Sequence, residues 1–311
     1  MTKNLENRVL LNFDSFKRSL KKKILPLALS IPLLFANTSC DLYNQYLNYI
    51  SINNIQEEEQ IIEKKKKAVI LINTSELEKP EYDLGYSSLR TLYNILRLNK
   101  IGYDSTDIYV LGHDESYSYS SPLYPDNSFT FDDYRQLTRK NLEDVMNEIN
   151  DKYSEDAFLM IHVIGDSIKE DLDKDGTFDS SSTKFVDEKY YSYEYPELIS
   201  SFLRNERKVG LNIDQNYSGF IYDSFNENQK DNILVLVSSG KNEEINNFSF
   251  SNYFSNLLYN AEEIDSTKFN SDGNISGQEA FDYLSENMTN STPQLWTKDT
   301  TQSEDFYLSK Y

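Results

Sequence analysis

The sequence predicts an α/β fold in which a mostly parallel sheet carries helices on both faces. Short apolar runs rich in β-branched residues recur along the chain, which is typical of strands buried on both sides. Segments with apolar residues spaced by three and four separate these runs and predict amphipathic helices. Strands that alternate with helices of this length usually form a parallel sheet.

The expected elements follow one another from residue 68 onward. Apolar runs predict strands at residues 68–72, 108–111, 157–164, 209–213 and 233–237. A helix capped by Ser87 and Ser88 and a second helix capped by Thr138 follow the first two strands. Three further helices are expected at residues 195–202, 250–258 and 278–287.

The chain is acidic, and this limits its partners. The formal net charge of the 311 residues is -20. The first 40 residues carry seven Lys and Arg against two Asp and Glu, which leaves 24 against 49, or -25, for residues 41–311. Such a surface repels phosphate backbones, so we expect no nucleic-acid partner. Divalent cations and cationic partners suit it better.

The first 40 residues have the pattern of an export signal. Five Lys and Arg at positions 17–23 precede an uncharged apolar run at residues 24–36. Thirteen helical residues rise about 20 Å, less than the roughly 30 Å core of a bilayer, so a cleaved signal is favoured over a spanning helix. The small residues before Cys40 resemble a bacterial lipoprotein cleavage box, although Asn37 stands where leucine is usual. We therefore expect lipidation of Cys40 and anchoring to the bacterial cell membrane or outer envelope, with an ordinary signal and an incidental cysteine as the alternative.

The rest of the chain divides into three parts. Residues 41–66 are polar and carry blocks of like charge, as expected of a tether. Residues 67–298 contain the alternating strands and helices and form the expected domain, and residues 299–311 form a tail.

Polar residues follow the third and fourth expected strands, where α/β sheets place their chemistry. Gly165, Asp166 and Ser167 follow the third strand. The turn after the fourth strand begins at Asp214 and continues through Gln215 and Asn216. The further pocket candidates are Tyr217, Ser218 and Gly219 in this turn and Ser238 and Ser239 after the fifth strand.

These two segments resemble the caspase-like cysteine peptidases, which include caspases, metacaspases and legumain-type enzymes. In that family the third strand ends in Ser-Gly-His-Gly, whose His is the general base. The fourth strand ends in Asp-x-Cys-Tyr/His-Ser-Gly, whose Cys is the nucleophile. Here Asp166 takes the position of the histidine and Asn216 that of the cysteine. The resemblance covers roughly residues 67–297 and implies a caspase-like three-layer sandwich.

The substituted pair predicts a catalytically inactive domain with a binding or scaffolding role for a protein or peptide partner. Thiol catalysis needs a cysteine, and the one cysteine of this sequence is Cys40 in the signal. A carboxylate such as Asp166 is a weak base at neutral pH unless burial raises its pKa. The alternative is a hydrolase that uses Ser167 or Ser218 with Asp166 and His162.

An acidic segment predicts a calcium site. Asp171, Asp173 and Asp175 stand at alternate positions before Gly176, as in the first half of an EF-hand loop, and Asp179 follows. The twelfth position holds Ser182 in place of the usual glutamate, so a plain solvated loop is the alternative. A second stretch, residues 270–279, predicts a turn and a helix cap formed by Ser276 and Glu279.

Overall fold

The described residues of the computed structural model all belong to the expected domain and its immediate flanks. They are residues 65–74, 81–97, 103–113, 119–121, 124–129, 131–202, 207–228, 231–245, 248–298, 303 and 307–310. The expected signal segment with Cys40 and nearly all of the expected tether lie outside this set. Among the helices described, none has the length and apolar character needed to cross a membrane.

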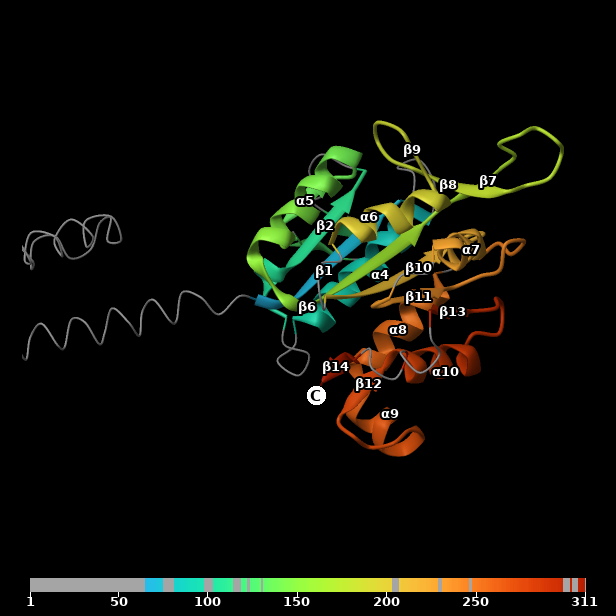
Figure 1. Cartoon of the computed structure of the whole chain (residues 1–311). Coiled ribbons are helices and arrows are strands. Elements are labelled where there is room, and N and C mark those ends of the chain that lie inside the picture. The colour runs from blue at the N-terminus through green and yellow to red at the C-terminus, as the bar shows by residue number, and fades with distance from the viewer. Residues whose placement is uncertain are drawn as a thin grey trace, which may run out of the picture. The chain divides into compact units, whose positions relative to one another are not determined.

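A seven-stranded sheet forms the centre of the fold (Figure 1). Its order is β13-β11-β10-β6-β1-β2-β5, and every pairing is parallel except that of β13 with β11. The strands are β1 (Lys65–Asn73), β2 (Ile108–Gly112), β5 (Tyr134–Gln136), β6 (Tyr153–Gly165), β10 (Lys208–Gln215), β11 (Ile233–Val237) and β13 (Gln294–Thr297). Because β1, β6 and β10 are central and buried on both sides, their sequences are nearly continuous apolar runs.

Helices cover both faces of this sheet and create two hydrophobic cores. Val69 and Leu71 of β1 belong to the core under α4 (Glu81–Leu96), α8 (Ser249–Tyr259), α9 (Ala261–Lys268) and α10 (Gly277–Asn287). Ile70 and Ile72 belong to the core under α5 (Arg139–Lys152), α6 (Tyr195–Phe202) and α7 (Gly219–Asn228). The predicted α/β three-layer arrangement is therefore confirmed.

Three smaller sheets and two short helices complete the described structure. Antiparallel β7 (Ile168–Glu170), β8 (Ser180–Lys184) and β9 (Lys189–Tyr191) form a sheet that follows β6. The remaining elements are the β3 (Tyr119–Ser121) and β4 (Tyr124–Phe129) hairpin, the β12 (Asn274–Ser276) and β14 (Tyr307–Lys310) pair, and the 3-10 turns η2 (Ser105–Asp107) and η3 (Ser192–Glu194).

Most expected helix boundaries agree with the structure, but the first is wrong. Helix α4 begins at Glu81, so Ser87 and Ser88 lie inside it and cap nothing. Ser88 instead donates a hydrogen bond to Asn252 of α8 at 3.4 Å, which a residue on a packed helix face can do. Thr138 does cap α5, since its side chain accepts a hydrogen bond from the amide of Asn141.

The expected tail also takes part in the fold, because β14 pairs with β12 and buries Leu308.

Candidate functional site

The carboxyl ends of β6 and β10 lie side by side, and they bring together the two segments that the sequence singles out. Ile164 pairs with Asp214 and Gly165 pairs with Gln215 in the parallel register. Gly165 has φ +134°, a conformation that residues with a side chain rarely adopt, and the chain turns away from the sheet there. Asp166 and Asn216 directly follow these paired strand ends, and the two segments touch where the Ser167 hydroxyl donates to the Asn216 carbonyl.

The side chain of Asn216 holds a loop in place. Its Oδ1 accepts a hydrogen bond of 2.6 Å from the backbone amide of Ile245, in the segment that follows β11. Its backbone carbonyl accepts a hydrogen bond from the Ser167 hydroxyl. Asn216 thus connects three segments, and its amide oxygen is engaged in structure.

Asp214 and Gln215 were expected in the turn, but they are the last two residues of β10. Gln215 is fully buried, and its Nε2 donates to the Thr74 hydroxyl at 2.7 Å and to the Asp166 carbonyl at 3.4 Å. Its Oε1 accepts from the Thr183 hydroxyl at 3.4 Å. Gln215 therefore ties the ends of β1, β6 and β8 together under the site. A polar residue at the end of a buried apolar strand could have indicated that Gln215 has buried hydrogen-bond partners.

The serines after β10 and β11 form a closed hydrogen-bond network. The amide of Ser218 donates to Ser239 Oγ and the amide of Ser239 donates to Ser218 Oγ, each at 3.1 Å. The hydroxyls of Ser238 and Ser239 both donate to the Gln215 carbonyl, at 3.3 and 3.0 Å. All three serines are fully buried. These hydrogen bonds hold the turn after β10 against the end of β11. The three hydroxyls do not face solvent.

His162 of β6 and Asp214 of β10 both contact Ser251 of α8, on the face of the sheet that this helix covers. His162 Nε2 lies 2.9 Å from Ser251 Oγ, and Asp214 Oδ2 accepts from the Ser251 amide at 2.8 Å. Both side chains are fully buried. Burial lowers the pKa of His162 to about 3 and raises the pKa of Asp214 to about 6, the latter despite hydrogen bonds from Ser251. His162 is therefore a neutral structural histidine at neutral pH.

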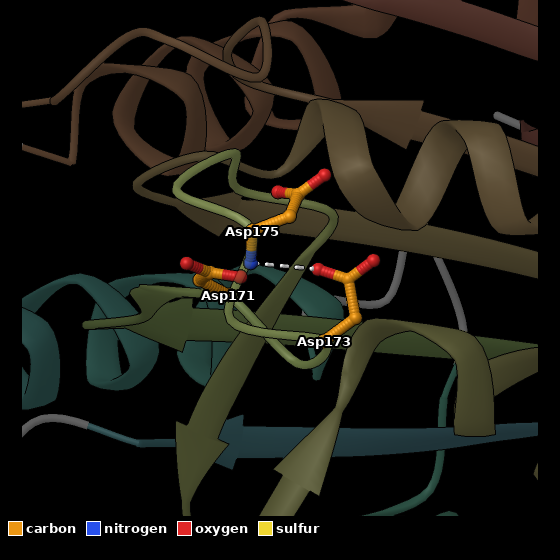
Figure 2. Close-up of side chains that lie close together, drawn as sticks. All are labelled: Asp171, Asp173 and Asp175. Atoms are coloured by element: carbon orange, nitrogen blue, oxygen red, sulfur yellow. Dashed lines mark hydrogen bonds between the residues drawn. The ribbon is translucent and has the colours of Figure 1, made fainter.

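The acidic segment forms the loop between β7 and β8, and three of its four carboxylates gather (Figure 2). Oxygens of Asp171, Asp173 and Asp175 lie within 4.8 Å of one another. Asp179 is not part of this group, and its Oδ1 accepts a hydrogen bond from the Leu172 amide at 3.2 Å. Backbone amides already occupy part of the cluster, as Gly176 donates to Asp171 Oδ2 at 2.9 Å. The arrangement offers three of the four expected oxygen donors on one side of the loop.

The second loop predicted as a cap has that structure. Ser276 Oγ accepts from the Glu279 amide at 3.2 Å, and Glu279 accepts from the Ser276 amide at 2.8 Å. This reciprocal pair starts α10 as a capping box.

Comparison with known proteins identifies similar structures. The sequence matches no protein-family model and no curated protein. The structure is similar to that of protein GSU0716 from Geobacter sulfurreducens, with a TM-score of 0.51 and 12% identity, covering 79% of this chain and 99% of that one. It also matches drICE, a caspase, with a TM-score of 0.43 and 8% identity, covering 77% of this chain and 91% of that one. At such identities, the likeness to GSU0716 extends to the fold alone.

Proposed function

We propose that this protein is an exported, lipid-anchored, caspase-like domain that is catalytically inactive and binds a protein or peptide partner. The observation that carries the proposal is the hydrogen bond from the Ile245 amide to Asn216 Oδ1. The residue in the position of the family's nucleophile acts here as the anchor of a loop. An amide side chain has no titratable proton and is a poor nucleophile, so this role is compatible with binding but not with thiol chemistry.

The neighbouring position supports the same conclusion. Asp166 follows Gly165 where the family has its histidine, and a carboxylate does not offer the imidazole nitrogen that serves as the general base in that family. The dyad is therefore substituted at both positions, while the turn that presents it is retained. A surface built in this way can recognise a ligand without transforming it.

The test is a search for turnover by the purified full chain. Peptide libraries of broad sequence are incubated with wild type and with Asn216→Ala, Asp166→Asn and Asn226→Ala, the last as a remote control. We expect no cleavage by any of them. Turnover by wild type and Asn226→Ala that is lost in Asn216→Ala or Asp166→Asn would overturn the proposal.

A serine hydrolase is less well supported by the geometry. The Ser167 hydroxyl donates to the Asn216 carbonyl, and Ser218 is fully buried in contact with Ser239. His162 hydrogen-bonds to Ser251, on the side of the sheet covered by α8. A serine nucleophile needs a base within hydrogen-bond reach. Labelling of Ser167 or Ser218 by a fluorophosphonate would support this alternative against the inactive domain.

A calcium-responsive role is a second candidate, favoured by one atom. Asp171 Oδ1 is shielded from solvent and has no hydrogen-bond partner among the described residues, although it lies in a cluster of carboxylates. Hard cations prefer such oxygens. Calorimetry with Ca²⁺ on wild type and Asp173→Asn tests the role, and the absence of heat at millimolar Ca²⁺ would remove it.

The membrane anchor rests on the signal pattern and Cys40. We expect the protein to fractionate with membranes and to incorporate labelled fatty acid. Cys40→Ser should abolish both, because it removes the thiol that would carry the lipid. Unchanged fractionation and labelling of that variant would refute the anchor and leave the binding function open.

A further inference from the structure

Lys169 lies between two aromatic rings next to the strand-end site. Its Nζ lies 4.6 Å from the centroid of the Tyr217 ring and 5.3 Å from that of Phe178. It also donates a hydrogen bond of 3.2 Å to Asn242 Oδ1. The four residues come from β7, the β7–β8 loop, the turn after β10 and the loop after β11. Two ring faces and an amide oxygen around one ammonium group form a recognised type of cation site.

The backbone holds the Tyr217 ring rigidly in this position. Tyr217 has φ +55°, the left-handed region that bulky residues seldom occupy. Its amide donates to the Glu243 carbonyl at 3.0 Å, and its hydroxyl hydrogen-bonds to the Glu244 carboxylate. A hydroxyl that donates to a carboxylate gives its ring more negative charge, which favours a cation on the ring face. Strained backbone of this kind persists where the surrounding structure fixes it and is frequent at binding sites.

Phe178 supplies the second ring and does little for the core. Its side chain is 55% exposed, one of the more exposed large apolar side chains among the described residues. An exposed phenylalanine beside an acidic loop has no evident folding role, whereas a contact with a cation uses its ring face. The Phe178 ring therefore contributes to a cation contact more than to the core.

The contact of Lys169 with this site is weak enough to be exchanged. A cation–π contact at an exposed position changes an equilibrium about two- to fivefold. The loss of rotamer freedom in the long lysine side chain opposes this contact. An incoming ammonium group, delivered by a partner whose other contacts hold it in place, can replace Lys169 at little net cost. The net charge of -20 attracts such a partner.

We propose that Phe178, Tyr217 and Asn242 form a clamp for a lysine side chain of a basic partner segment, and that Lys169 occupies this clamp in the free protein. The inference rests on the proposed binding function and names the chemistry of the ligand. Lys169 acts as an internal competitor, so the site becomes available only when its side chain moves away.

The experiment uses n-butylammonium, which reproduces the end of a lysine side chain. NMR titrations of the full chain follow the amide signals of Tyr217 and Phe178 in wild type, Lys169→Ala and Lys169→Gln. Lys174→Ala is the matched control, because it removes the same charge from the adjacent loop. We expect both Lys169 variants to bind about fivefold more tightly than wild type and Lys174→Ala.

Two further variants locate the binding on the rings. In the Lys169→Ala background, Phe178→Leu should weaken binding about fivefold, whereas Tyr193→Leu, which removes another exposed ring, should not change it. Equal titration curves for wild type and both Lys169 variants, or equal shifts with uncharged n-butanol, would overturn the clamp. These outcomes would leave the proposed function intact, and peptide turnover would overturn that function without affecting the titration.

Discussion

The side chain of Asn216 and the backbone amide of Ile245 form a hydrogen bond of 2.6 Å between the turn after β10 and the loop after β11. Ile245 is half-buried, so loss of this bond would leave its backbone amide with limited access to water. The pair fixes the loop that carries Glu243 and Glu244 against the end of the sheet. Asn216 therefore has a structural role that is independent of any ligand.

Asn216→Ala should reduce the free energy of unfolding by about 1 kcal/mol, the usual net value of one hydrogen bond. Hydrogen exchange of the Ile245 amide should become faster than in wild type. Asn216→Asp keeps an acceptor oxygen and should retain most of the protection. Equal exchange in wild type and the alanine variant would contradict the assigned role.

The buried pair His162 and Asp214 predicts opposing pH dependences. The pKa of Asp214 rises from 3.8 to about 6 on folding. Between these values the folded state binds the extra proton, so the free energy of unfolding falls as pH rises. The pKa of His162 falls from 6.5 to about 3, so in that range the unfolded state binds the extra proton and stability rises with pH. Between pH about 4 and 6 the two effects offset each other.

Asp214→Asn should reveal the dependence due to His162. The variant keeps an acceptor for the Ser251 amide and loses the titrating carboxyl. Its free energy of unfolding should increase with pH between about 4 and 6, by up to about 1.4 kcal/mol per pH unit relative to wild type. Urea unfolding at several pH values measures this slope. His162→Gln should give the opposite slope, and parallel curves for all three proteins would show that neither group is buried as described.

The central sheet could be predicted because its strands are long apolar runs. The sheet of β7, β8 and β9 could not, because β8 is Ser180–Lys184, a buried strand with the sequence SSSTK. Its serines are satisfied by hydrogen bonds, such as that between Ser180 and Ser192 at 2.9 Å, and no apolar pattern marks them. The antiparallel strand β13 was also not predicted, because its four residues are too few to show a pattern.

The location of the candidate site could be predicted from the sequence, but the contacts among its residues could not. The carboxyl ends of parallel strands lie at the same end of a sheet, which was enough to place Asp166 and Asn216 after two neighbouring strands. The partner of Asn216 could not be foreseen, since Ile245 lies in a loop without periodicity, 29 positions away. The contact of Lys169 with Tyr217 depends on a backbone conformation that tyrosine does not itself favour.

Gly219 provides a steric test of the turn. A Cβ on Gly219 would lie 2.5 Å from the backbone nitrogen of Lys241 and 2.8 Å from the carbonyl carbon of Gly240. Both are backbone atoms, so one of the two segments must move. Gly219 is the first residue of α7, where helix propensity alone would favour alanine. A loss of stability in Gly219→Ala therefore measures the close approach.

We expect Gly219→Ala to lower the free energy of unfolding by about 1–3 kcal/mol, as overpacking does. Gly240→Ala is the matched control, because its Cβ would meet only the Glu243 side chain, at 3.5 Å, an ordinary contact. Its effect should stay within about 0.5 kcal/mol. Since the displaced segment carries Asn242 and Glu244, Gly219→Ala should also shift the amide signal of Tyr217. Equal stability of the two alanine variants would mean that the turn and the loop are not in contact.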